Sequence, residues 1–377
     1  MNRSRVLLAA TAAAAVISIG TPASAKRGDK IEGSYICVFK NDTVARGNVR
    51  SEANKAASQG GGNVKHVYEN SIRGFSTNMS ATAAAQLASR NQRISYCEQD
   101  QEVTADQDAM TFRELGKPTA GTPTQPAQRT PWGITRVGGG GSASSNKAWV
   151  IDTGIDLDHP DLIVDQTLSK NFVSRETSPN DLNGHGSHVA GTIAAVKNTI
   201  GVVGVVPGTT VVAVRVLNRR GSGSNSDVIA GVDYVAKTGS VGDVANMSLG
   251  GGVSAALDSA VIAASKNVKF ALAAGNESDN ANNHSPGRAN GANIYTVSAF
   301  ADGDKWASFS NYGNPPIDYA EPGVSILSTY KDGGYATLSG TSMATPHLAG
   351  LLLAGAVRSG GTVADDPDPN NDTIGVH

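Results

Sequence analysis

The chain has little cysteine, almost no net charge and, beyond its first residues, no long apolar run. Its 377 residues include only two cysteines, Cys37 and Cys97, so the rest of the chain must fold without disulfides. The formal charge of −2 at pH 7 provides no basic excess of the kind that nucleic acids or anionic membranes attract. We therefore expect neither as a partner.

The one long apolar run lies at the N-terminus. Arg3 and Arg5 precede the apolar residues 6–19, and Ala23-Ser24-Ala25 supplies a small-residue cleavage pattern. This pattern predicts an export signal over residues 1–25. A membrane anchor is the alternative, although the run is short for a span. We expect a secreted, extracellular protein without membrane attachment once the signal is removed.

The segment that follows, residues 33–105, alternates short strands and helices in the order β-α-β-β-α-β. This order predicts a small α+β domain of the ferredoxin-like type. The first and last strands of that topology can lie close together, so Cys37 and Cys97 either form a disulfide or remain two buried thiols. Residues 106–130 are rich in Pro, Thr, Gln and Gly, which predicts a linker.

Residues 131–377 repeatedly alternate apolar strands with helical segments, which predicts an α/β domain with a parallel sheet flanked by helices. Functional groups of such a domain gather at the carboxyl ends of its strands. The acidic stretch from residue 365 to 372 looks disordered. Asp302 and Asp304 are more typical of a solvated acidic loop than of a second cation site.

Four motifs carry residues suited to acyl transfer. Asp152 ends the strand Val-Ile-Asp, and His185 begins a helix within Asn-Gly-His-Gly-Ser-His. Asn276 ends the strand segment Ala-Ala-Gly-Asn, and Ser342 begins a helix within Gly-Thr-Ser-Met-Ala. A serine nucleophile needs a histidine base, and a carboxylate orients that imidazole. The Asn276 amide and the Ser342 backbone N–H are candidate donors to the developing oxyanion.

These motifs resemble the subtilisin (subtilase) family, whose triad follows the order Asp, His, Ser along the chain. The spacings fit as well, with 185 − 152 = 33 and 342 − 185 = 157 residues between neighbouring members. The resemblance implies a subtilisin-like serine endopeptidase that needs no catalytic cofactor, cleaves proteins or peptides and is monomeric. It also implies that residues 33–105 are an inhibitory propeptide, removed by self-cleavage near Ala105–Asp106. A permanently attached accessory domain is the alternative.

The resemblance further assigns a peptide-binding cleft. An extended substrate would pair with the edge strands, whose glycines admit a close backbone approach. Such binding depends on the main chain more than on side chains, so broad specificity favouring apolar or aromatic residues is expected. No acidic cluster, which would be typical of a dedicated processing protease, is apparent near the proposed pockets. The residues assigned to this cleft are Gly221, Ser222, Gly223, Ser248, Leu249, Gly250, Ala274 and Gly275.

A structural calcium site is also implied by the resemblance, with an uncharged turn as the alternative. Its ligands would be hard oxygen donors, and the family's N-terminal ligand has no clear counterpart in the sequence. The residues assigned are Asp161, Asn198 and, through their carbonyls, Val196, Ile200 and Val202.

Other classes of protein fit the sequence less well. A binding protein on this scaffold would normally lack a triad member, and a lipase or esterase would surround its serine with Gly-x-Ser-x-Gly. A dedicated processing protease is compatible with every motif and would differ only in its specificity.

Overall fold

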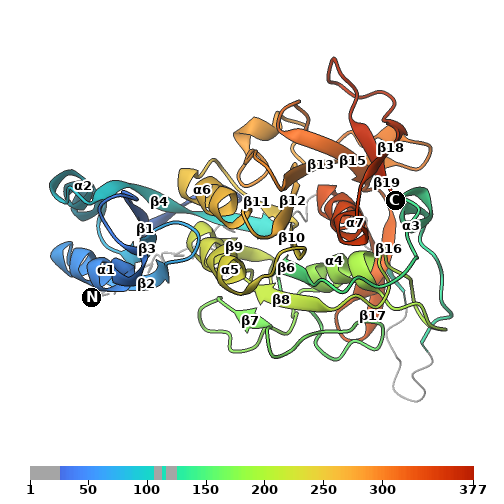
Figure 1. Ribbon diagram of the computed structural model, residues 1–377, viewed down its shortest axis with the longest axis horizontal. Helices are drawn as coiled ribbons and strands as arrows, with labels where there is room; N and C mark the ends of the chain where they lie inside the picture. The colour runs from blue at the N-terminus through green and yellow to red at the C-terminus, as the bar shows by residue number, and fades with distance from the viewer. Residues whose placement is uncertain (1–25, 106–112, 116–124) are drawn as a thin grey trace, which may run out of the picture.

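The computed structural model describes residues 26–105, 113–115 and 125–377. The predicted export signal and most of residues 106–124 lie outside the described residues. Figure 1 shows a small N-terminal part and a larger part, and strand β4 (Ile94–Ala105) runs from the first into the second.

The N-terminal part has the element order expected from the sequence. Its strands form an antiparallel sheet in the order β4-β1-β3-β2. The elements are β1 (Lys30–Phe39), the 3-10 turn η1 (Arg46–Asn48), α1 (Val49–Gln59), β2 (Asn63–Tyr68), β3 (Gly74–Asn78), α2 (Ala81–Arg90) and β4 (Ile94–Ala105).

The period of two along β1 explains how this sheet is covered. Tyr35, Cys37 and Phe39 point into a cluster with apolar residues of α1 and α2. The alternate residues Ile36 and Val38 join the apolar cluster of two helices in the larger part, α5 (Asn225–Thr238) and α6 (Ala255–Ala264). Since successive side chains of a strand face opposite sides, one strand serves both the core of the small part and the interface.

Cys37 and Cys97 form a disulfide in this part. They lie directly opposite each other on the antiparallel strands β1 and β4. The pairing resolves the choice between a bridge and two thiols in favour of the bridge, which joins the first and last strands of the small sheet.

The larger part is built on a sheet whose central strands are all parallel. Its order is β18-β19-β15-β13-β12-β10-β6-β8-β7, with β14 beside β13. The strands are β6 (Ala148–Asp152), β7 (Lys170–Asn171), β8 (Val211–Arg215), β10 (Val244–Met247), β12 (Lys269–Ala273), β13 (Ile294–Ala301), β14 (Lys305–Trp306), β15 (Ile317–Pro322), β18 (Arg358–Thr362) and β19 (Thr373–Val376).

Helices cover both faces of this sheet, as predicted (Figure 1). Trp149 and Ile151 of β6 pack into the cluster under α5 and α6, whereas Ala148 and Val150 pack under α4 and α7. The helices are α3 (Trp132–Arg136), α4 (His185–Ala194), α5 (Asn225–Thr238), α6 (Ala255–Ala264), α7 (Thr341–Ala354) and the 3-10 turn η2 (Ala281–Asn283). The shorter strands are β5 (Arg113–Leu115), β9 (Ser222–Ser224), β11 (Leu249–Gly250), β16 (Ile326–Tyr330) and β17 (Gly334–Leu338).

The C-terminal tail differs from its expected disorder. Strands β18 and β19 extend the main sheet beyond β15. Asp372 is buried and accepts a hydrogen bond from the Asn314 amide (2.7 Å) and another from the Ser298 hydroxyl. The predicted disorder of residues 365–372 is therefore wrong, because Asp372 has fixed protein partners. Asp304, in the loop between β13 and β14, is also paired with a protein group, the Arg136 guanidinium (2.7 Å).

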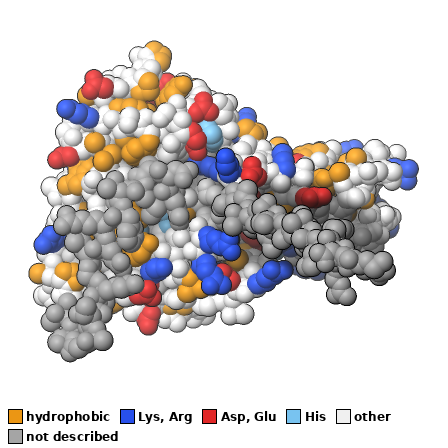
Figure 2. Space-filling model, turned by 180° about the vertical axis from the view of Figure 1, so that it is seen from behind, with side chains coloured by type: hydrophobic (Ala, Val, Ile, Leu, Met, Phe, Trp, Pro, Cys, Tyr) orange, Lys and Arg blue, Asp and Glu red, His pale blue; other side chains and the backbone are white. Residues whose placement is uncertain are grey.

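Part of the predicted linker is also ordered. Residues 113–115 form β5 and pair with β17, and Ala127 and Arg129 make bridges to Ile200 and Val202. Figure 2 shows basic and acidic side chains interspersed on the face opposite to that of Figure 1. No helix among the described residues is long and apolar enough to cross a membrane.

Candidate active site

The candidate catalytic residues meet at the carboxyl edge of the main sheet. Asp152 is the last residue of β6, and Asn276 follows β12 by three residues. Strand β10 lies between β6 and β12, and Ser248 follows its end. His185 is the first residue of α4, and Ser342 is the second residue of α7. Parallel strands end at a common edge, so motifs far apart in sequence become neighbours.

Asp152 and His185 form a buried pair. Nδ1 of His185 lies 2.8 Å from Oδ1 and 3.0 Å from Oδ2 of Asp152, and both side chains have no exposed surface. The backbone N–H of Thr153 donates to the same carboxylate (2.7 Å). A carboxylate held in this way keeps the proton on Nδ1 and leaves Nε2 to act as a base.

The loop before His185 is held by Asp181, a residue that the sequence analysis did not single out. Its carboxylate accepts hydrogen bonds from the Thr153 hydroxyl (2.9 Å), from the Gly184 N–H (2.8 Å) and from the Ser187 hydroxyl (2.7 Å). Asp181 thereby ties the Asp152 strand to the start of α4. The available signal was the position of Asp181 shortly before His185, the first residue of α4.

A close backbone contact also fixes α4 against β6. A Cβ atom on Gly186 would lie 2.0 Å from the carbonyl oxygen of Gly154. A contact that short is impossible, so any side chain at residue 186 would push the His185 helix away from Asp152. The motif around His185 therefore needs glycine at this position for packing.

Ser342 and Ser248 bind each other. The Ser342 hydroxyl donates to the Ser248 carbonyl (3.1 Å), and the Ser248 hydroxyl donates to the Ser342 carbonyl (2.8 Å). Both residues are fully buried. This reciprocal pair joins the start of α7 to the end of β10, where one wall of the predicted pocket lies.

Only one end of the Asn276 carboxamide is hydrogen-bonded among the described residues. Its Oδ1 accepts a hydrogen bond from the Thr341 N–H at the start of α7 (2.8 Å). Its Nδ2 is buried and has no hydrogen-bond partner among the described residues. Gly340, two residues before Ser342, lies beside it, since a Cβ on Gly340 would be 3.2 Å from Nδ2. An unpaired buried donor beside the serine suits a developing oxyanion.

Strand β4 fills the groove between two edges of the larger part. On one side Thr104 and Val103 pair with Ser222 and Gly223 of β9. On the other side Ala105 pairs with Leu249 of β11, and Thr104 also pairs with Gly250. The Ala105 N–H donates to the Gly221 carbonyl (2.8 Å). An extended peptide is thus bound by main-chain hydrogen bonds along both edges.

The Ala274-Gly275 segment follows β12, the strand beside β10, and lies at the same carboxyl edge as Asn276. Gly275 N donates to the Thr341 hydroxyl (3.2 Å), and the Ala274 carbonyl accepts from the Asn311 amide (3.0 Å). Glu277, two residues further on, accepts from the same amide (2.6 Å). The sequence predicts no acidic cluster near this pocket, and the single acid Glu277 does not contradict that prediction. The position of Glu277 beside Asn311 follows from the fold of the loop after Asn276.

The oxygen atoms of the predicted calcium loop converge on the side chain of Gln128. Its Nε2 lies 3.2 Å from Oδ1 of Asn198, and it also contacts the carbonyl oxygens of Val196 (2.8 Å), Ile200 (3.3 Å) and Val202 (3.2 Å). Asp161 is buried beside them and accepts from the Asn198 amide (2.8 Å). Gln128, N-terminal to these residues, is therefore a candidate for the N-terminal ligand that has no clear counterpart in the sequence motifs.

This donor set fits calcium. Carbonyl and amide oxygens only accept hydrogen bonds, so several of them around one point favour a cation. If the Gln128 amide rotates by 180°, its Oε1 joins them, and hard oxygen ligands of this kind are those that Ca²⁺ prefers. Among the described residues no group of three or more His, Cys, Asp or Glu side chains could hold a metal ion. A calcium ion here would therefore depend on main-chain and amide oxygens.

Two further histidines pack beneath the site. Burial lowers the pKa of His188 to about 3 and that of His347 to about 4. His188 Nε2 donates to the Ile326 carbonyl (3.0 Å), and His347 Nδ1 donates to the Met343 carbonyl (2.9 Å). Both rings are neutral and hold α4 and α7 in place.

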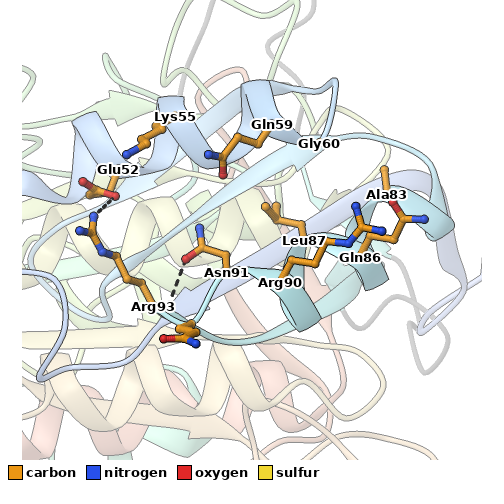
Figure 3. A pocket seen from close by; sticks show the side chains of 11 residues that line it. Glu52, Lys55, Gln59, Gly60, Ala83, Gln86, Leu87, Arg90, Asn91 and Arg93 are labelled. Carbon is orange, nitrogen blue, oxygen red and sulfur yellow. Dashed lines mark hydrogen bonds and ion pairs between the residues drawn. The ribbon is translucent and has the colours of Figure 1, made fainter.

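A separate cavity of about 620 Å³ lies between α1 and α2, on the side of the small sheet that faces away from the larger part (Figure 3). Its rim carries an ion pair between Glu52 and Arg93, together with Lys55 and Arg90. It contains no nucleophile or paired carboxylates.

The fold and this site define a serine protease of the subtilisin class, and comparisons with known proteins agree. Residues 148–355 match the subtilase family, and the chain belongs to that family. It is 38% identical over 333 residues to the subtilisin-like serine protease AsES of Sarocladium strictum, which covers 86% of this chain and 80% of that protein.

Two other similar proteins support the assignment. The chain is 40% identical over 300 residues to alkaline serine exoprotease A of Vibrio alginolyticus, covering 76% of this chain and 52% of that protein. The match thus spans about half the length of that relative. The crystal structure of a cold-adapted subtilisin-like serine proteinase aligns with a TM-score of 0.56 at 38% identity, covering 64% of this chain and 96% of that structure.

Proposed function

We propose that this protein is a secreted serine endopeptidase that hydrolyses peptide bonds through Asp152, His185 and Ser342. The observation that supports this most strongly is β4, an extended peptide held by both edges of a groove that leads to the catalytic edge. A foreign peptide would bind in the same way, through its main chain, so we expect broad specificity.

The residues would act in the following order. The Ser342 hydroxyl leaves the Ser248 carbonyl, and its oxygen attacks the substrate carbonyl carbon while His185 Nε2 takes the proton. The carbonyl oxygen becomes an oxyanion that receives hydrogen bonds from Asn276 Nδ2 and the Ser342 N–H. The C–N bond then breaks, and His185 gives the proton to the leaving amine. Water repeats these steps on the acyl-enzyme and frees Ser342.

The N-terminal part would act as an inhibitory propeptide. Its last strand occupies the groove, and its acidic side chains hold the helices of the larger part. Glu98 accepts hydrogen bonds from the Ser254 hydroxyl and the Ala256 N–H at the start of α6. Asp100 accepts from the Ser226 N–H at the start of α5 (3.1 Å). Negative charges at helix N-termini are favourable. Self-cleavage near Ala105–Asp106, just beyond the end of β4, would release this inhibitor.

The remaining proposals concern export, calcium and assembly. The sequence of residues 1–25 supports export. A calcium ion bound by Gln128, Asp161, Asn198 and the carbonyls of Val196, Ile200 and Val202 would tie the segment before α3 to the loop after α4. We expect a monomer, with proteins or peptides as substrates and no catalytic cofactor.

The test compares the wild-type precursor with Ser342→Ala. Intact mass shows whether residues before the catalytic part are removed, and casein hydrolysis measures activity. Loss of this hydroxyl in subtilisin itself lowers kcat by about 2 × 10⁶. We expect the variant to retain its N-terminal part and to leave casein intact. If both proteins are trimmed alike and neither cleaves casein, the proposal is wrong.

A further inference from the structure

The residues just after the predicted export signal contact the larger part directly. Residues 26–29 precede β1 and pair with β4: Gly28 N donates to the Glu102 carbonyl, and Glu102 N donates to the Asp29 carbonyl, both at 2.9 Å. Hydrogen bonds on this side of β4 pass to β11 two residues later, at Thr104. Residues 26–29 and β11 therefore lie end to end along the same side of β4.

The backbones meet closely at this junction. Gly28 has a φ of +80°, and a Cβ on it would lie 3.2 Å from the backbone nitrogen of Gly252. A residue with a side chain would be strained here and would also crowd Gly252. The Lys26 backbone nitrogen donates to the Asp29 carboxylate (2.7 Å) and closes a turn. Cleavage after Ala25 would make this nitrogen a charged amine, which strengthens such a bond.

Arg27 extends from this turn across the mouth of the proposed substrate pocket. Its guanidinium rests on Gly250, where an added Cβ would lie 2.0 Å from Nη2. The same guanidinium forms an ion pair with Glu277. The side chains of Arg27 and Glu277 are only 18% and 31% exposed. Arg27 thus bridges the two sides of the pocket, because Gly250 belongs to one predicted wall and Glu277 follows the other.

Glu277 is fixed in position to receive this charge. The Asn311 amide donates to its carboxylate (2.6 Å), and the Glu277 N–H donates to the Asn311 side-chain oxygen (2.9 Å). The neighbouring acid Asp279 accepts hydrogen bonds from the Asn283 amide and His284. These hydrogen bonds hold the Glu277 carboxylate at the place where it pairs with Arg27, which reduces the entropy lost on pairing.

We propose that Arg27 is a second inhibitory contact of the precursor. Through its ion pair with Glu277, Arg27 covers the mouth of the proposed substrate pocket. The same contact holds the N-terminal part on the larger part independently of β4. This inference rests on the proposed function, because it assigns a regulatory role at the same cleft. Arg27 leaves with the N-terminal part, so it controls how fast activity appears and has no influence on the activity of the mature enzyme.

The experiment follows casein hydrolysis after the precursor, without its signal, is refolded by dilution from denaturant. Mature enzymes from wild type, Arg27→Ala, Arg27→Lys and Arg27→Glu have identical sequences, so the final activity reports folding yield and the lag before activity reports release. We expect the lag to shorten about fivefold in Arg27→Ala and Arg27→Glu, consistent with loss of a partly buried charged contact. Arg27→Lys should be intermediate, because it keeps the charge but loses the guanidinium geometry.

The matched control is Arg50→Ala. Arg50 pairs with Glu69 inside the N-terminal part, and its side chain is 65% exposed. Its removal should leave the lag unchanged, which excludes a general effect of losing an arginine. Added salt should shorten the wild-type lag more than that of Arg27→Ala, since screening weakens a partly exposed ion pair. Lags within twofold of wild type for Arg27→Ala and Arg27→Glu would refute the inference while leaving the protease proposal intact.

A second measurement separates the two proposals. Hydrogen exchange of Ser342→Ala and Ser342→Ala/Arg27→Ala precursors requires no activity. We expect faster exchange in residues 250–252 and 275–277 of the double variant. If wild type never becomes active, the proposed function fails, and this measurement still decides the role of Arg27. Equal exchange in both precursors would overturn the second contact.

Discussion

The two ends of the Asn276 carboxamide have different tasks, and substitution can separate them. Oδ1 accepts from the Thr341 N–H, whereas Nδ2 is buried and unpaired among the described residues. Asn276→Ala removes both ends. Asn276→Asp keeps the acceptor at the start of α7 and replaces only the donor. The aspartate should therefore preserve stability and lose activity, whereas the alanine should lose both.

The expected magnitudes follow from these contacts. Loss of one oxyanion donor lowers kcat by about 10²–10³, the range measured for the corresponding amide in subtilisin itself, or about 2.7–4 kcal/mol. KM should change little, because the donor acts on charge that develops only in the transition state. Loss of the acceptor for Thr341 N should cost about 1 kcal/mol of stability, as for other helix caps. Asn276→Asp avoids that cost, since a carboxylate at a helix N-terminus is favourable.

The assay measures kcat and KM on a peptide substrate and the melting temperature of each processed enzyme. Slow variants are processed by a trace of tagged wild-type enzyme, which is then removed. Asn276→Asp with kcat within threefold of wild type would refute the assignment of Nδ2 as an oxyanion donor. If the melting temperature of Asn276→Asp is as low as that of Asn276→Ala, the contact with the Thr341 N–H does not stabilise α7.

Two further predictions concern stability. Chelation should lower the melting temperature of wild type by about 5–10 °C, the equivalent of about 2.7 kcal/mol when calcium exceeds its Kd a hundredfold. Gln128→Ala should weaken this response and Gln125→Ala should not, because Gln125 binds the Gly333 carbonyl instead; an unchanged wild-type melting temperature would rule the site out. Glu321 on β15 is fully buried without a hydrogen-bond partner among the described residues, and burial raises its pKa well above the usual value. In the folded protein Glu321 keeps its proton at a pH where the same side chain in the unfolded chain releases it. The free energy of unfolding therefore falls as pH rises above the ordinary glutamate pKa. Glu321→Gln should therefore gain stability over wild type from pH 4 to pH 8, whereas the exposed Asp302→Asn should not; a constant difference across that range would contradict the argument.

Much of the fold and of the candidate site could be predicted from the sequence because the information is local. The strand and helix alternation from Ala148 to Ala273 is carried by apolar periodicity, and the structure confirms the parallel sheet covered on both faces. The motifs around Asp152, His185 and Ser342 identify a family because each residue sits at a strand end or a helix start with its own turn chemistry. The order of these motifs along the chain was sufficient to separate this class from other serine hydrolases.

Contacts between distant segments could only be decided by the tertiary structure. Gln128 reaches Asn198 across 70 residues, and Arg27 reaches Glu277 across the joined parts. The acidic tail becomes ordered because β19 pairs with β15 and buries Asp372. Local composition does not predict such partners, because they are determined by how each segment packs against the rest of the chain. The sequence by itself therefore determined the class of protein and its candidate catalytic residues. Only the tertiary structure decided which distant groups meet around the cleft, because those contacts depend on how the two parts pack together.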